Sequence, residues 1–355
     1  MSRLLFQKPR HFFLPLLRAL DDRRIMIQFL ADNIDQLDLA LDQLAVCDRN
    51  FDRFALMLVD NVVELTLHRF IQDKANENEM WGRFSEPKHD PKIIQKGLGQ
   101  NFDGKAKAAR KLGFFDHALC ESILNLHSYR NSSYHQGLRH EAILHSLALF
   151  YFKCACEVLK AYEPQFWGWS SNDKISYRAK KYLGDTGFMG HKAAFQAAYD
   201  RLSEVVSSME NKLIHDLTED MRSTIDSTDD AINFLSADGP DDKNRDEVII
   251  DSQAWPFAFT EEGKRIAHEG GYSNQTVGGL VKWLIANYNW PVPTDPIPSW
   301  KSRLNSLSNE QEKHKALKKY CDFMRQTEDI RSKIDESAFQ LDAHIQQQID
   351  IMRGK

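Results

Sequence analysis

The chain has 355 residues, of which 42% are hydrophobic, and its formal net charge is −5 at pH 7. This length and apolar content suffice for two or three folded domains, which excludes an intrinsically disordered protein. The slightly acidic balance excludes binding of duplex nucleic acid through a global basic field, so any such contact must come from a local patch.

The five cysteines form no CxxC pair, and no histidine stands at zinc-ligand spacing from them. We therefore expect a reducing, cytoplasmic environment with neither metal nor cofactor. The first 20 residues superficially resemble a signal peptide, but Pro15 and Arg18 interrupt the apolar stretch, and residues 21–24 are charged where small residues should precede cleavage. The longest apolar run, residues 143–159, contains charged side chains. We expect a soluble chain without a membrane span.

Apolar residues recur every three or four positions through residues 22–73, which predicts two helices with a break near residues 48–50. Residues 76–104 are polar and contain proline and glycine, as expected for a loop with short helical pieces. Helical patterns then resume in three segments, at residues 105–112, 115–129 and 138–162.

Apolar residues in heptad-like spacing predict one long helix over residues 202–221. Residues 216–251 then carry twelve acidic and three basic side chains, a local net charge of −9, which is typical of a solvated linker at a domain boundary. Val248–Ile250 is a possible strand, and Thr260 is positioned to cap a helix. A final helix is expected from about residue 301.

These patterns predict an all-α protein in which a bundle of four or five helices precedes long coiled-coil-like helices. We divide the chain into an N-terminal helical extension (1–49), a helical bundle (50–165), an aromatic and basic segment with a long helix (166–235), an acidic linker (236–250) and a small C-terminal module with a helical tail (251–355).

The most specific chemical feature is the run from Arg130 to His135, which contains Asn131 and Tyr134. Arginine stays protonated and presents planar donors to phosphate oxygens, whereas histidine exchanges protons near neutrality. Positions five apart lie roughly 140° apart on a regular helix. The spacing therefore predicts a kinked helix, or a site shared by two subunits. An ordinary helix junction with surface residues is the alternative.

A zinc-protease interpretation of His140, Glu141 and His145 is disfavoured, because three residues separate the glutamate from the second histidine. The motif requires two, so these histidines fall on different helix faces.

Together with its flanks, the run resembles the ribonuclease members of the HEPN (higher eukaryotes and prokaryotes nucleotide-binding) superfamily. These carry an arginine, often followed by asparagine, and a histidine that four to six residues separate from the arginine. Asp60–Leu67 and Phe102–Gly113 are similar to two earlier helices of that family. The resemblance covers roughly residues 50–165.

The resemblance implies a helical bundle that dimerises so that two motifs line one cleft, and it implies metal-independent RNA cleavage. His135 would then act as general base or acid, Arg130 would stabilise the developing phosphoryl charge, and Asn131 would orient the phosphate or a water. Some toxin members carry a modified tyrosine two residues after the histidine. Gly137 stands there in this chain, and Tyr134 is offset.

Asp60 and Glu64 share a helix face, and one of them is expected to hydrogen-bond Arg130 or His135, unless both are simply exposed. Residues 83–111 carry a local net charge of +5, from eight basic and three acidic side chains, and residues 167–182 mix aromatic with basic side chains. Such mixtures bind RNA, although aromatic packing beside a solvated basic face is the alternative. The candidate RNA-binding residues are Lys105, Lys107, Arg110, Lys111, Arg139, Lys180 and Lys181.

The expected function is thus a homodimeric endoribonuclease acting on an RNA such as tRNA or mRNA, as a toxin or antiviral effector with an antitoxin or regulatory partner. The alternative is a noncatalytic helical module that binds RNA or a protein.

Overall fold

The computed structural model describes residues 26–81, 86–135, 141–165, 167, 174–184, 191–209, 212–273 and 276–354, without the side chains of residues 81, 132–135 and 141. The described residues form fourteen α-helices and contain no strand, which confirms the all-α fold class. The chain divides into two compact units, here called the N-terminal unit (residues 1–213) and the C-terminal unit (residues 214–355).

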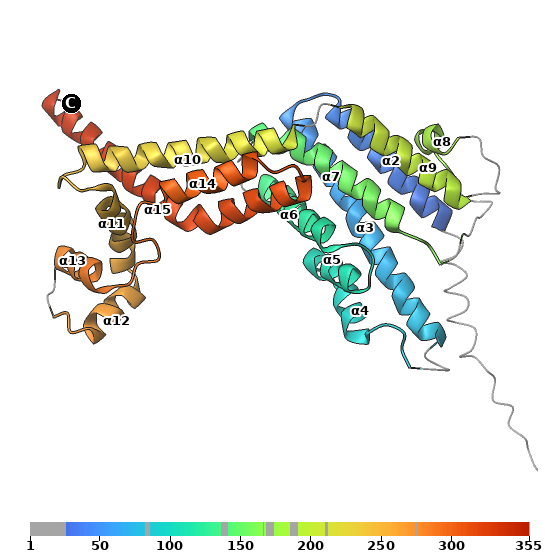
Figure 1. The fold of residues 1–355 in the computed structure, drawn as a ribbon, viewed down its shortest axis with the longest axis horizontal. Helices are drawn as coiled ribbons and strands as arrows, with labels where there is room; N and C mark the ends of the chain where they lie inside the picture. Colours follow the sequence, from blue (N-terminus) through green and yellow to red (C-terminus); the bar gives the residue numbers. More distant parts are fainter. Residues whose placement is uncertain are drawn as a thin grey trace, which may run out of the picture. The chain divides into compact units, whose positions relative to one another are not determined.

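The N-terminal unit contains eight of the helices. They are α2 (Met26–Leu44), α3 (Arg49–Trp81), α4 (Pro91–Gly97), α5 (Phe102–Lys111), α6 (His117–His135), α7 (Glu141–Ala161), α8 (Tyr177–Leu183) and α9 (His191–Ser208). In Figure 1, α2, α3, α7 and α9 lie side by side, and α4, α5 and α6 pack along α3. The short helix α8 contacts α2 and α9.

Helix α2 forms because its apolar residues recur at helical spacing, and the structure buries this stripe against α3, α7 and α9. Its buried apolar side chains include Ile27, Leu30, Ile34, Leu37, Leu41 and Leu44. Helix α2 therefore belongs to the bundle, and the predicted extension over residues 1–49 is wrong for its described part. The first 25 residues, including the signal-like segment, lie outside the described residues.

Three carboxylates of α3 are bound by side chains of α7 and of Tyr162, the residue that follows it. Asp52 contacts the His145 ring at 2.7 Å, and Asp60 and Asp73 accept hydrogen bonds from Tyr151 and Tyr162, each at 2.7 Å. The residue numbers rise together on both helices, so α3 and α7 run in the same direction. These polar contacts fix their register, because a shift by one residue would bury each carboxylate without its partner.

Among the described residues, Ala142–Ala161 of α7 is the one helix whose length and composition would allow it to cross a membrane. Within its most apolar window, 78% of the residues are buried in the protein. That burial is the pattern of a helix at the centre of a bundle, and α7 contacts α2, α3, α6 and α9.

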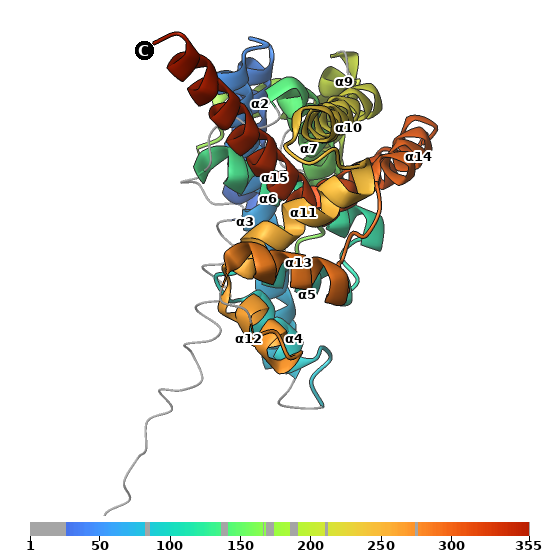
Figure 2. The ribbon, with the colours of Figure 1, turned by 90° about the vertical axis from the view of Figure 1, so that its left-hand side faces the viewer.

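The C-terminal unit contains the remaining six helices. They are α10 (Leu213–Asp238), α11 (Arg245–Ala258), α12 (Glu261–Glu269), α13 (Val277–Asn287), α14 (Ile297–Ser308) and α15 (Lys313–Met352). Figure 2 shows α11, α12 and α13 grouped together, and these helices contact one another. Their shared core consists of Ala254, Ala258, Ala267, Val281, Leu284 and Trp290.

Two predictions of secondary structure are wrong in this region. The possible strand at Val248–Ile250 lies inside α11, which Asn244 starts by accepting a hydrogen bond from the Glu247 backbone while the Glu247 side chain bonds the Asn244 backbone. This capping box outweighs the strand preference of the β-branched run. The predicted helix over residues 202–221 is two helices, since α9 ends at Ser208 and α10 begins at Leu213.

The acidic stretch is helical over most of its length and belongs to the C-terminal unit. Helix α10 continues to Asp238, and it buries Leu217, Met221 and Ile225. Of its acidic residues, Glu219, Asp226, Asp230 and Asp238 are exposed. Asp229 forms ion pairs with Arg245 and Lys301 at 2.6 and 2.9 Å. The division between the units therefore falls near residue 213 instead of at the predicted linker over residues 236–250.

Candidate functional site

Helix α6 carries the run from Arg130 to His135. It begins at His117, where the Asp116 side chain accepts a hydrogen bond from the Leu119 backbone at 2.8 Å. Ile123 and Leu126 are fully buried, which anchors one face of α6 in the bundle. The backbone is helical without interruption from residue 117 to residue 135.

Asp60 lies at the centre of a polar cluster beneath this helix. It is buried on α3, and its Oδ1 accepts a hydrogen bond from the Tyr151 hydroxyl at 2.7 Å and lies 2.9 Å from Nδ1 of His127. Burial, together with the charge of Asp60 and the hydrogen bond to it, raises the pKa of Tyr151 well above its ordinary value. Tyr151 therefore remains a neutral hydroxyl that donates to Asp60.

The cluster continues from His127 to the first two residues of the run. Nε2 of His127 lies 3.0 Å from Nδ2 of Asn131, and Oδ1 of Asn131 accepts a hydrogen bond from Arg130 at 2.9 Å. Nε of Arg130 lies 3.6 Å from Oδ2 of Asp60. We call Asp60, His127, Arg130, Asn131 and Tyr151 the α6 cluster.

An aromatic ring from α5 limits the movement of His127. The Phe102 ring stacks on the imidazole with ring centroids 3.7 Å apart and an angle of 2° between the planes. The His127 side chain is only 15% exposed, whereas the Arg130 side chain is 32% exposed. The α6 cluster thus places the partly exposed guanidinium of Arg130 beside the buried or largely buried side chains of Asp60 and His127.

The structure gives less information on the second half of the run. His135 and Tyr134 are helical residues, but their side chains lie outside the described part of the chain, as does the whole of Arg139. Positions 130 and 135 of one continuous α-helix differ by roughly 140° around its axis.

Glu64 and Lys105 bind each other. Nζ of Lys105 lies 2.6 Å from Oε1 of Glu64 and 3.3 Å from the Gln100 carbonyl oxygen. The Lys105 side chain is 7% exposed. Glu64 therefore supports α5, and the ammonium group of Lys105, predicted to contact RNA, is buried and paired in this structure.

Other predicted RNA-binding residues differ in their availability. Lys107 is exposed and pairs with Asp103 at 3.0 Å; Lys111 and Lys180 are exposed, and Arg110 is partly buried. Lys181 lies 3.0 Å from buried Asp38 of α2. The basic residues are therefore spread over α5 and α8, and some of them serve contacts within the bundle.

Asp38 binds three side chains of α8. Arg178 and Tyr182 donate to it at 2.6 Å, and Lys181 is the third donor. Burial alone would raise the pKa of Asp38, but the hydrogen bonds from Tyr182, Lys181 and Arg178 outweigh burial and lower it. Part of the aromatic and basic segment thus attaches α8 to α2.

Sequence reasoning did not assign a role to His127, Tyr151 or the pair of Asp52 and His145. A usable signal existed for His127, because it follows buried Leu126 and lies four residues after buried Ile123. Asp60 similarly lies between Val59 and the buried Val62 and Val63. A titratable residue on an apolar stripe needs a buried polar partner, although the sequence alone does not say which one.

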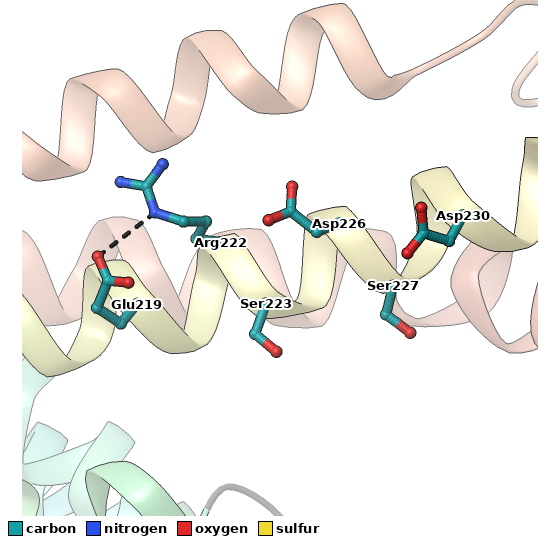
Figure 3. A pocket seen from close by; sticks show the side chains of 6 residues that line it. All are labelled: Glu219, Arg222, Ser223, Asp226, Ser227 and Asp230. Carbon is teal, nitrogen blue, oxygen red and sulfur yellow. Dashed lines mark hydrogen bonds and ion pairs between the residues drawn. The ribbon is translucent and has the colours of Figure 1, made fainter.

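No group of three or more His, Cys, Asp or Glu side chains suited to a metal ion occurs among the described residues. In the C-terminal unit, a hollow of about 480 Å³ runs along α10 (Figure 3). Its lining residues are Glu219, Arg222, Ser223, Asp226, Ser227 and Asp230. Because all six belong to one helix, this hollow lacks the convergence of polar groups that binding sites show.

Comparisons with known proteins give no further assignment. No protein-family model, curated protein or solved structure matches the chain.

Proposed function

We propose that the chain is a metal-independent endoribonuclease whose active site contains Arg130, Asn131 and His135. The observation that carries this proposal is the α6 cluster, in which Arg130 and Asn131 are held at the surface by buried Asp60 and His127. A catalytic cation must be fixed before the reaction to stabilise charge efficiently. The similarity of the run to HEPN ribonucleases agrees with this reading.

The proposed reaction is an internal transesterification of RNA. The 2′-oxygen attacks the adjacent phosphorus and the bond from phosphorus to the 5′-oxygen breaks, so the products are a 2′,3′-cyclic phosphate and a 5′-hydroxyl. His135 takes the proton of the 2′-hydroxyl or gives one to the leaving 5′-oxygen. Arg130 stabilises the negative charge on the phosphoryl oxygens, and Asn131 orients the phosphate or a water.

We further propose a cytoplasmic homodimer in which two copies of the run line one cleft. The difference of roughly 140° between positions 130 and 135 supports a site composed of residues from two subunits. Exposed Lys107, Lys111 and Lys180 are candidates for contacting the RNA backbone. A toxin or antiviral effector, with an antitoxin or another regulatory partner, is the biological role that the family resemblance favours.

The alternative is a noncatalytic helical module that binds RNA or protein. The α6 cluster also agrees with that function, because its hydrogen bonds join α3, α6 and α7 and would stabilise a scaffold equally well.

RNA cleavage in the presence of EDTA distinguishes the two functions. We expect the purified full chain to cut total RNA or a tRNA pool, and Arg130→Ala and His135→Ala to lower the rate by roughly 10²–10⁴-fold. The matched control is His117→Ala, which changes an exposed histidine of the same helix and should leave the rate unchanged. Fragment ends should carry 2′,3′-cyclic phosphates.

Two results would overturn the proposal. If the folded wild type and both variants leave the RNA equally intact, the chain is not this nuclease and the binding module is favoured. If EDTA stops the cleavage, the metal-free mechanism is wrong. Sedimentation velocity on the same samples tests the dimer, since a monomer that cleaves at full rate contradicts the shared cleft.

A further inference from the structure

We propose that His127 is a positioning residue, which in its neutral form with the proton on Nδ1 holds the Asn131 amide so that Oδ1 faces Arg130. Its catalytic consequence rests on the proposed function, whereas the hydrogen-bond arrangement is independent of any reaction. His127 lies outside the run itself, three residues before Arg130 and four before Asn131, on the same helix.

The direction of each hydrogen bond follows from the chemistry of the partners. The ionised carboxylate of Asp60 can only accept, so Nδ1 of His127 donates to it across 2.9 Å. A neutral imidazole has one donor and one acceptor, so Nε2 accepts the hydrogen bond from Nδ2 of Asn131. The other atom of this amide, Oδ1, then accepts from Arg130. Each of these donors faces an acceptor.

The buried end of this series is fixed from three helices. Asp60 comes from α3 and is also bound by Tyr151 of α7, while Phe102 of α5 stacks on the His127 ring. Positions three and four residues apart are neighbours on a helix, so His127 can reach Asn131 beside Arg130. The fixed position of the Asp60 carboxylate thereby restricts the orientation of His127, then of Asn131, and finally of the partly exposed Arg130 guanidinium.

A second proton on His127 would disrupt the arrangement. An imidazolium donates from both nitrogens, so its Nε2 proton would face the Asn131 amide protons. Rotation of the amide would relieve that contact but would turn Nδ2 toward Arg130, which is also a donor.

Two substitutions distinguish a positioning role of His127 from a purely structural one. His127→Gln retains a carbonyl oxygen that can accept from Asn131 and cannot be protonated, whereas His127→Ala removes the acceptor. We expect His127→Ala to lower kcat by roughly 10–100-fold, and His127→Gln to recover most of the rate. His117→Gln is the matched control.

A measurement without RNA tests the arrangement directly. In the wild-type full chain labelled with ¹⁵N-histidine, the His127 resonances, assigned by their absence in His127→Gln, should show a protonated Nδ1 and a bare Nε2 at pH 8. The opposite tautomer would overturn the inference even if His127→Ala does not fold. Absence of RNA cleavage with the expected tautomer would refute only the proposed nuclease. Cleavage by a fully active His127→Ala would refute only the positioning role.

Discussion

The two units bury polar side chains in different ways. In the described residues, all buried charged side chains lie in the N-terminal unit: Asp38, Asp52, Asp60, Asp73 and Lys105. Each of these five has a partner on another helix. The buried polar residues of the C-terminal unit are uncharged: Thr218, Thr228, Ser252, Gln253 and Thr327. Each of them bonds a carbonyl oxygen one turn earlier on its own helix, and Gln253 alone of the five also bonds backbone outside its helix, at Val292.

This difference shows what determines helix arrangement in each unit. A buried carboxylate whose partners lie on another helix tolerates few alternative packings, because a shifted helix leaves a charge uncompensated. A hydroxyl that donates to a carbonyl oxygen of its own helix keeps this hydrogen bond however that helix packs against its neighbours. The N-terminal unit should therefore respond strongly to changes at single polar residues, and the C-terminal unit only weakly.

The largest effect is expected for Asp60→Ala. The substitution leaves the buried Tyr151 hydroxyl and the His127 Nδ1 proton without an acceptor, and it removes the carboxylate next to Arg130. Loss of one member of a buried charged network should lower the free energy of unfolding by about 3–5 kcal/mol. Scanning calorimetry of the full chain should show one transition lowered by roughly 10 °C, and hydrogen exchange should assign it to α3 and α6.

The matched control for this prediction is Asp60→Asn. Its Oδ1 can still accept the hydrogen bonds from Tyr151 and His127, whereas the Oδ2 that faces Arg130 is replaced by an uncharged amide donor. The asparagine variant should thus be clearly more stable than the alanine variant. Equal melting of the wild type and Asp60→Ala would show that the cluster does not hold the unit together.

An intermediate effect is expected at Asp38 and depends on pH. Because Asp38 has a folded pKa below the ordinary value of 3.8, its ion pairs stabilise the unit fully above that pH. The stabilisation disappears as the pH falls through the lowered pKa. The melting temperature of Asp38→Asn, compared with the wild type, should be lower at pH 6, and the difference should shrink toward pH 3. A pH-independent difference would contradict this account.

The smallest effect is expected for Thr228→Val in the C-terminal unit. Valine has nearly the same shape, and only the hydrogen bond from Oγ1 to the Thr224 carbonyl oxygen is lost. We expect a loss of at most about 1 kcal/mol, seen as a shift of the second calorimetric transition by no more than about 4 °C. A shift as large as that of Asp60→Ala would remove the distinction between the units.

Much of the helical architecture could be predicted from local patterns. The apolar stripes and the polar residues 48–50 correctly separate α2 from α3, and Thr260 caps α12 as expected. Apolar spacing could not predict the end of α9 at Ser208, because Leu202 and Val206 continue a stripe that Leu217 and Met221 extend in the other unit. Equal spacing is compatible with one helix or two.

Local sequence patterns could predict only part of the candidate site. Arg130 and Asn131 stand out by residue type, and Asp60 was one of two proposed supports. The choice between Asp60 and Glu64 requires the packing of α5 on α3, which places the Lys105 ammonium group 2.6 Å from Glu64. The role of His127 depends on a contact with Asp60 across 67 residues of sequence, which no local pattern encodes.

The division near residue 213 has a consequence for how the gene of such a chain can evolve by recombination. Each unit is a single uninterrupted stretch of sequence, so one recombination event near the codons for residues 209–213 would replace the whole C-terminal unit. The buried ion pairs of Asp38, Asp52, Asp60 and Lys105 would remain in the retained half. Such an exchange would leave every residue of the α6 cluster in the retained half.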